Sequence, residues 1–113
     1  MTSITRNYKG SLKGINRPKV RIPRRGEIWL ASMLDGIKDR PVIIVDYGYG
    51  TATVLKCTTK FNQEYHSQRI DDYEDAGLSS ETFVDPVRRI VSLDSLVWRI
   101  GELSEHDRGR FGV

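Results

Sequence analysis

The feature that most constrains the fold is the stretch PVIIVDYGYGTATVLKC, residues 41–57, in which two strand-like runs flank a turn rich in glycine. Pro41 fits only the first position of a strand, and the four residues after it are all β-branched, which is typical of a strand buried on both faces. The two glycines supply turn residues before the chain returns. The stretch therefore predicts an antiparallel hairpin with strands at 41–46 and 51–57.

Strand-like runs also dominate the rest of the chain. We expect further strands at 27–33, 66–71, 82–85, 88–91 and 97–101. Helical structure is expected only as a single turn around 94–96 and a short helix capped by Ser104, with Asp107 three positions later. Many short strands separated by turns predict a mainly β fold, a small closed or half-closed antiparallel barrel. A barrel of this size buries only about 60 to 65% of its unfolded surface, so a homodimer would help it.

Charge divides the chain into two parts. The first 25 of the 113 residues hold eight basic residues and no acidic one, which leaves ten basic against fifteen acidic residues and a formal charge of −5 for residues 26–113. We expect residues 1–25 to be a flexible basic arm and residues 26–113 to be the barrel domain. The arm is either a solvated leader or a segment that holds a polyanion through its phosphates.

Several classes of protein are disfavoured by composition. The chain has no apolar run near 18 residues and no signal-like core, so we expect a soluble cytoplasmic protein without a membrane partner. Cys57 is the only cysteine, and with only His66 and His106 beside it there is no zinc set. We interpret Cys57 as a buried small hydrophobe rather than a nucleophile. No metal or cofactor is expected.

Two polar residues stand at the same end of the predicted hairpin. Arg40 precedes its first strand and Thr58 follows its second, and antiparallel pairing places the entry of one strand beside the exit of the other. A guanidinium fork and a hydroxyl aimed at one point suit a phosphodiester, and the guanidinium would stabilise charge growing in a pentacoordinate transition state. The alternative is an ordinary surface arginine beside Asp39.

Five short pieces carry a family resemblance: RRGEIWLA, RPVIIV, VLKCTTK, AGLSSETFVDPVRRI and RIGELSEHD, in this order from about Arg24 to Asp107. Together they resemble the MazF/PemK (Kid-like) toxins of bacterial type II toxin-antitoxin pairs. The resemblance implies an SH3-like barrel that forms a homodimer, is bound by a cognate antitoxin, and cleaves single-stranded RNA without a metal. It also implies attack by the RNA 2′-hydroxyl, which yields a cyclic phosphate and a 5′-hydroxyl.

The resemblance also assigns roles to individual residues. Arg40 matches the arginine of the family's RP motif and Thr58 the threonine that ends its third strand, so both are expected to be catalytic. Asp85 would accept the 2′-proton or hydrogen-bond the 2′-hydroxyl; the alternative is that, before Pro86, it is a turn residue. The residues expected to bind substrate are Thr59, Lys60, Ser80, Asp85 and Arg88.

The chain departs from the family at three places. The loop from about Met33 to Asp39 is shorter than usual, and Phe83 stands where plasmid-borne relatives carry an arginine acid. The family's C-terminal helix is nearly missing, which puts the usual dimer packing in question. A second function therefore stays open, in which the barrel binds RNA or a partner protein without cleaving.

Trp98 is expected in the core or in a dimer contact. The aromatic residues expected either to stack on bases or to pack at the rim are Tyr47, Tyr49, Phe61 and Tyr65.

Overall fold

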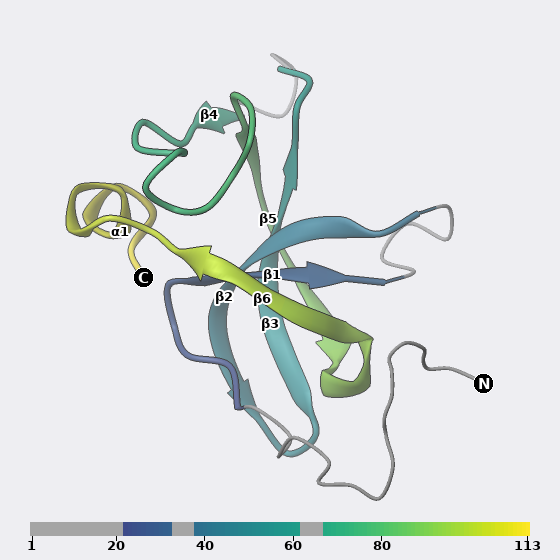
Figure 1. Ribbon diagram of the computed structural model, residues 1–113. Coiled ribbons are helices and arrows are strands. Elements are labelled where there is room, and N and C mark those ends of the chain that lie inside the picture. Colours follow the sequence, from purple (N-terminus) through teal and green to yellow (C-terminus); the bar gives the residue numbers. More distant parts are fainter. Residues whose placement is uncertain (1–21, 33–37, 62–66) are drawn as a thin grey trace, which may run out of the picture.

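The computed structural model describes residues 22–32, 38–61 and 67–113, and these form one antiparallel β-sheet with a short terminal helix (Figure 1). The strands are β1 (Glu27–Ala31), β2 (Arg40–Gly48), β3 (Thr51–Thr58), β4 (Gln68–Arg69), β5 (Phe83–Ser92) and β6 (Leu96–Glu102). Their spatial order is β4-β5-β3-β2-β1-β6. A 3-10 helix, η2 (Leu93–Ser95), joins β5 to β6, and α1 (Glu105–Phe111) follows β6.

The mainly β prediction is confirmed, with two corrections. β4 and β6 are the edges of the sheet and do not pair with each other in the described residues, so the sheet is not closed and the closed form of the barrel is wrong. The strands expected at 82–85 and 88–91 are one strand, β5, because the chain passes through Pro86 in a bulge instead of turning there. The strand expected at 66–71 is reduced to Gln68–Arg69, and residue 66 lies outside the described part.

Both faces of β2 are buried, as its run of β-branched residues predicts. Ile43 and Val45 belong to one apolar cluster with Leu55 and Cys57, whereas Val42 and Ile44 belong to a second. Alternation along a strand explains this division, because successive side chains point to opposite sides of the sheet. We call the first set the helix-side cluster, because Phe111 of α1 packs on it, and the second the open-side cluster.

The segment 70–78 and α1 cover the helix-side cluster together (Figure 1). Ile70 and Ala76 are fully buried in this cluster. The segment lies so close to β6 that a Cβ atom at Gly101 would be only 2.2 Å from the carbonyl oxygen of Ala76. Glycine is therefore required at this position to let the two backbones approach.

One buried carboxylate fastens α1 to this segment. Asp107 is fully buried, and its side chain accepts hydrogen bonds from the backbone N–H groups of Asp71 at 3.1 Å and Asp72 at 2.8 Å. The guanidinium of Arg110 donates to the same carboxylate at 2.8 Å. Ser104 caps the helix by accepting from the Asp107 N–H at 3.1 Å, which confirms the predicted cap.

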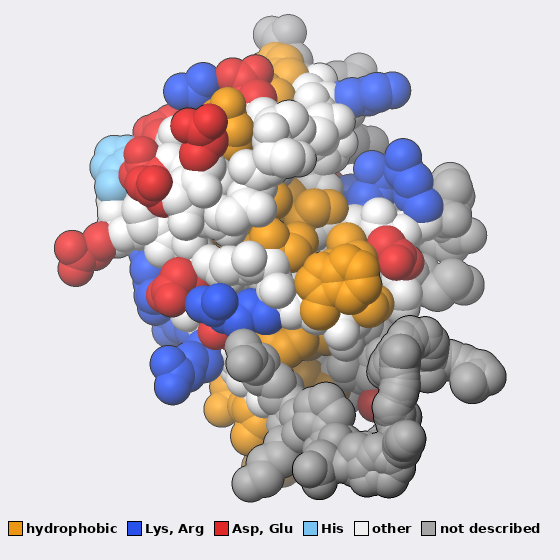
Figure 2. Space-filling model, in the orientation of Figure 1, with side chains coloured by type: hydrophobic (Ala, Val, Ile, Leu, Met, Phe, Trp, Pro, Cys, Tyr) orange, Lys and Arg blue, Asp and Glu red, His pale blue; other side chains and the backbone are white. Residues whose placement is uncertain are grey.

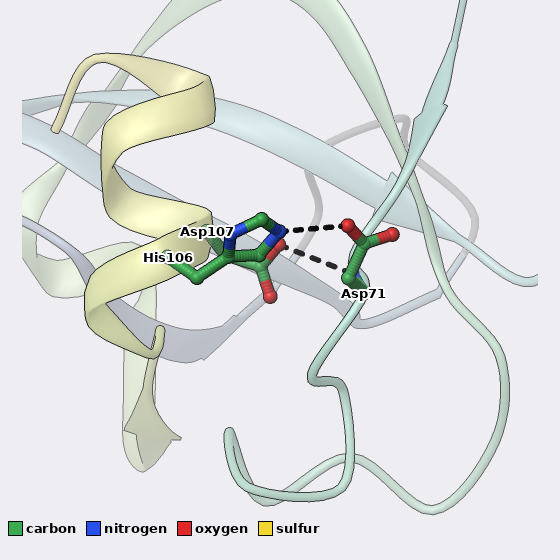
Figure 3. Close-up of side chains that lie close together, drawn as sticks. All are labelled: Asp71, His106 and Asp107. Atoms are coloured by element: carbon green, nitrogen blue, oxygen red, sulfur yellow. Dashed lines mark hydrogen bonds and ion pairs between the residues drawn. The ribbon is translucent and has the colours of Figure 1, made fainter.

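A histidine adds a second link at the surface. The exposed ring of His106 lies 2.9 Å from a carboxylate oxygen of Asp71, beside the Asp107 contact (Figure 3). The hydrogen bond to Asp71 raises the pKa of His106 and outweighs the loss of hydration, which lowers it. The charge of Asp107 makes a smaller contribution that also raises the pKa. The same contact lowers the pKa of the Asp71 carboxyl.

The expected core position of Trp98 is wrong, because 59% of this side chain is exposed. Val97 beside it is 45% exposed, and Figure 2 shows hydrophobic side chains at the surface near β6. The alternative expectation, a dimer contact, stays a prediction.

At the other end of the described chain, Pro23 is fully buried and the Arg25 guanidinium donates to the Gly112 carbonyl at 2.7 Å. Residues 1–21 of the predicted arm lie outside the description.

None of the helices in the described ranges has the length and apolar character needed to span a membrane.

We predict that Asp107→Ala lowers the free energy of unfolding by about 3 kcal/mol, because it removes a fully buried carboxylate that accepts from two part-buried backbone N–H groups and from the Arg110 guanidinium. Urea unfolding measures this change. Glu105→Ala, an exposed carboxylate on the first turn of the same helix, is the matched control and is expected to change stability by less than about 1 kcal/mol. Equal losses in the two variants would contradict the assignment.

We also predict a pH-dependent contribution from His106. Because its pKa is raised in the folded state, the contribution is complete below the unfolded value of about 6.5 and disappears as the pH rises through the folded value. His106→Gln should therefore lower the thermal midpoint more at about pH 5.5 than at about pH 8.5. A difference between wild type and variant that is the same at both pH values would refute this.

Candidate active site

The structure brings Arg40 and Thr58 to one pocket. Arg40 is the first residue of β2 and Thr58 the last of β3, and both line a cavity of about 290 Å³. A neighbouring cavity of about 220 Å³ shares both residues and also contains Thr59. The other residues that line the first cavity are Lys56, Lys60, Phe61, Ser67 and Asp85.

Strand alternation explains why these side chains converge. Arg40 lies two residues before Val42 of the open-side cluster, and Val42 pairs with Lys56, which lies two residues before Thr58. Residues two apart on a strand point to the same face, so the three polar side chains extend the open face of the sheet beyond its apolar cluster. The strand ends hold them next to loops, on a rigid base.

The electrostatics of the pocket suit an anion. Three of its lining side chains, those of Arg40, Lys56 and Lys60, carry positive charge, and Asp85 is the only carboxylate among the lining residues. Thr58 accepts a hydrogen bond from the Lys60 N–H at 3.2 Å through its hydroxyl oxygen. Because a hydroxyl both accepts and donates, its proton can turn outward to a phosphate oxygen.

Asp85 is a buried carboxylate at the wall of this pocket, with 5% of the residue exposed. One carboxylate oxygen accepts from the Val87 N–H at 2.9 Å across Pro86, and the other lies 3.4 Å from the Arg89 guanidinium. The turn interpretation and the site interpretation of Asp85 are thus compatible, because the turn fixes the side chain while the pocket exposes its edge.

Two of the predicted substrate-binding residues lie away from the pocket. Arg88 pairs with Leu55 of the helix-side cluster, so it is on the opposite face of the sheet, where it lines a separate cavity of about 190 Å³ with Phe111. Ser80 is exposed, and its carbonyl accepts from the Thr82 hydroxyl at 2.8 Å. Their roles, like that of Thr59, stay predictions.

Sequence reasoning missed two residues of the pocket. Lys56 was signalled by its position, because a residue two before Thr58 must share its face. Ser67 is buried in the pocket wall, and no motif in the sequence marked it. Phe61 is 58% exposed at the rim and meets Phe83 edge-on, with ring centroids 5.5 Å apart.

The cluster of Asp71, His106 and Asp107 has the donor types of a metal site, since one ligand atom from each lies within 4.8 Å of the others (Figure 3). Its carboxylates are, however, already bonded to the backbone N–H groups, the guanidinium and the imidazole described above. We interpret the cluster as the fastening of α1. His66 lies outside the described residues.

Comparisons with known proteins support the fold. No protein-family model matches the chain, and no curated protein matches it in sequence. Among solved structures, the Mycobacterium tuberculosis toxin MazF-mt6 matches with a TM-score of 0.63 and 23% identity, over 76% of this chain and 88% of that one. A mycobacterial endoribonuclease in complex with its cognate antitoxin matches with a TM-score of 0.66 and 16% identity, over 80% and 88% of the two chains.

A third structure, an endoribonuclease from a mycobacterial species, gives a TM-score of 0.64 at 15% identity over 84% of this chain and 88% of that one. The chain therefore has the MazF-like fold, as the resemblance in its sequence implied.

The buried position expected for Cys57 is confirmed. Its side chain is fully buried in the helix-side cluster, and burial raises the pKa of its thiol to about 12. The thiolate is the reactive form, so this sulfur has no nucleophilic role near neutral pH.

We predict that Cys57 in the native protein reacts with a thiol reagent such as iodoacetamide at least about 100-fold more slowly than in the guanidinium-unfolded chain, because both protonation and burial protect it. Mass spectrometry of timed samples measures the rates. Labelling at similar rates in the two states would show that the thiol is accessible.

Proposed function

We propose that this protein is the toxin of a type II toxin-antitoxin system and a metal-independent endoribonuclease that cleaves single-stranded RNA. The observation that carries the proposal is the convergence of Arg40 and Thr58 on one basic pocket in a chain with the MazF-like fold. The solved structures with this fold include endoribonucleases, which favours the same class of reaction here.

The pocket contains the groups that an internal transfer of the phosphodiester requires. The 2′-oxygen of RNA forms a bond to phosphorus while the bond to the 5′-oxygen breaks, and the products are a cyclic phosphate and a 5′-hydroxyl. In this scheme Asp85 accepts the 2′-proton, and the 5′-oxygen takes up a proton from water as it leaves. Arg40 and the Thr58 hydroxyl bind the non-bridging oxygens, where negative charge increases in the transition state.

The remaining cations have a supporting role. Lys56 and Lys60 line the same cavity and can neutralise the phosphates that flank the scissile one. Thr59 lies in the adjoining cavity and is a further candidate for phosphate binding. With three cations and a single carboxylate among the lining residues, the side chains stabilise an anion directly rather than supplying the carboxylate set that a divalent ion prefers.

The same charge pattern makes an antitoxin partner reasonable. An acidic segment of such a protein would compete with RNA for Arg40 and its cationic neighbours. One of the structures with this fold is an endoribonuclease bound to its cognate antitoxin. We further propose a cytoplasmic homodimer, in which the exposed side chains of Val97 and Trp98 are covered by the second copy.

We predict that the purified protein cleaves a long unstructured RNA in EDTA and leaves 2′,3′-cyclic phosphate and 5′-hydroxyl ends. Arg40→Ala is expected to lower kcat by about 100- to 1,000-fold, and Thr58→Val, which keeps the shape but removes the hydroxyl, by about 10- to 100-fold. Gel assays, with end analysis by kinase labelling, measure both effects.

Arg69→Gln is the matched control, because it removes an exposed arginine that pairs with Glu81 away from the pocket, and it should retain activity. Substitution of deoxyribose at the cleaved position should abolish the reaction, because the nucleophile is then missing. Intact RNA with measurable binding would overturn the nuclease and leave the alternative, a barrel that only binds RNA or a partner protein.

A further inference from the structure

We propose that Arg89 is a positioning residue that acts through Asp85: it holds this carboxylate in the orientation in which it faces the pocket. The inference rests on the proposed ribonuclease function and adds to it a residue outside the pocket. Asp85 lines the cavity together with Arg40 and Thr58, whereas Arg89 is not among the lining residues. Arg89 therefore contacts the carboxylate from beside the cavity rather than from within it.

The bulge in β5 makes the contact between the two residues possible. In a regular strand, residues four apart are separated by about 13 Å along the chain direction. Here Leu55 pairs with Arg88 while Cys57 pairs with Val84, so the ladder changes register between Asp85 and Arg89. The bulge around Pro86 kinks this stretch, and the guanidinium reaches the carboxylate at 3.4 Å.

Two partners, the Val87 N–H and the Arg89 guanidinium, together fix the orientation of the Asp85 carboxylate. The Val87 N–H holds one oxygen at 2.9 Å, but a carboxylate bonded at one oxygen can still rotate about that contact. The ion pair with Arg89 at the second oxygen removes this freedom. With both oxygens held, the carboxylate keeps one orientation in the cavity wall, where a proton acceptor must meet the 2′-hydroxyl.

The Arg89 side chain itself has a feature that points to function. Its Nε is buried and has no hydrogen-bond partner in the described part of the chain. A buried N–H without an acceptor weakens folding, and sequences retain such groups mainly where a functional arrangement requires them. The guanidinium therefore keeps its contact with Asp85 even though its own Nε–H group has no acceptor among the described residues.

The charged groups around Asp85 allow Arg89 to be tested separately. Lys56 of β3, Arg40 of β2 and Lys60 of the loop after β3 line the same cavity as Asp85. Lys56 and Lys60 can bind RNA directly, so their removal should raise KM, whereas Arg40 contacts the reacting phosphate and its removal lowers kcat. Removal of Arg89 should instead lower kcat, because the RNA contacts stay and only the proton acceptor loses its orientation.

The test is a double-mutant cycle on RNA cleavage with Arg89→Gln, Asp85→Asn and both together. We expect Arg89→Gln to lower kcat by about 10- to 100-fold with KM changed by less than about twofold, and to have less than a twofold further effect in the Asp85→Asn background, since the contact is then already lost. Arg89→Lys, which keeps the charge, should recover part of kcat. Arg69→Gln is the charge-matched control.

Three results would overturn the inference. These are unchanged cleavage by Arg89→Gln, a loss of similar size with and without Asp85, and a loss expressed mainly in KM that disappears at high salt. The last would show that Arg89 binds phosphate itself.

A second measurement does not depend on activity. Hydrogen exchange at the Val87 amide, read by NMR on the folded protein, should be at least about threefold faster in Arg89→Gln, because its acceptor becomes mobile. An unchanged rate also overturns the inference. If wild type does not cleave RNA, the proposed function fails, and this amide still decides whether Arg89 holds Asp85.

Discussion

The pairing of β5 with β3 changes register once, and the arrangement of the candidate site depends on this change. An unbroken ladder that starts from the Leu55–Arg88 pair would place Pro86 opposite Cys57, where a residue without an N–H weakens the sheet. The bulge removes Pro86 from the ladder, so that Val84 instead pairs with Cys57. It also leaves the Val87 N–H available for the Asp85 carboxylate. Because Pro86 has no N–H group, the strand forms a bulge there, and this bulge holds the buried Asp85 carboxylate in place.

The two faces of the sheet have separate tasks. The helix side carries α1 and the segment 70–78, which are held by Asp107 and by the close approach at Gly101. The open side has its own apolar cluster, and the pocket begins where that cluster ends. Because the fastening of α1 and the pocket share no residue, the polar side chains of the pocket can be arranged for an anion without weakening the contacts that close the helix onto the sheet.

Much of this arrangement follows from the sequence by simple rules. The β-branched run after Pro41 and the turn glycines specify the hairpin, and antiparallel pairing then brings Arg40 to Thr58. Alternation would also have found Lys56. The bulge was harder to find, because a proline between two apolar runs reads equally well as a turn; treating β5 as two strands concealed that Arg88 lies on the other face from Asp85. Whether the sheet closes depends on its curvature and on contacts between distant strands, which no local pattern specifies.

Charge is distributed as unevenly in space as it is along the chain. The acidic residues 71, 72, 74 and 75 lie in the segment over the helix side, and acidic side chains gather near α1 in Figure 2, whereas three cations line the pocket on the open side. A formal excess of negative charge in the folded part therefore coexists with a local cluster of cations on the open side. Such a cluster produces a local positive potential, which favours approach of a polyanion with the open side forward. Orientation on approach is in this way determined by the spatial separation of charge rather than by its total.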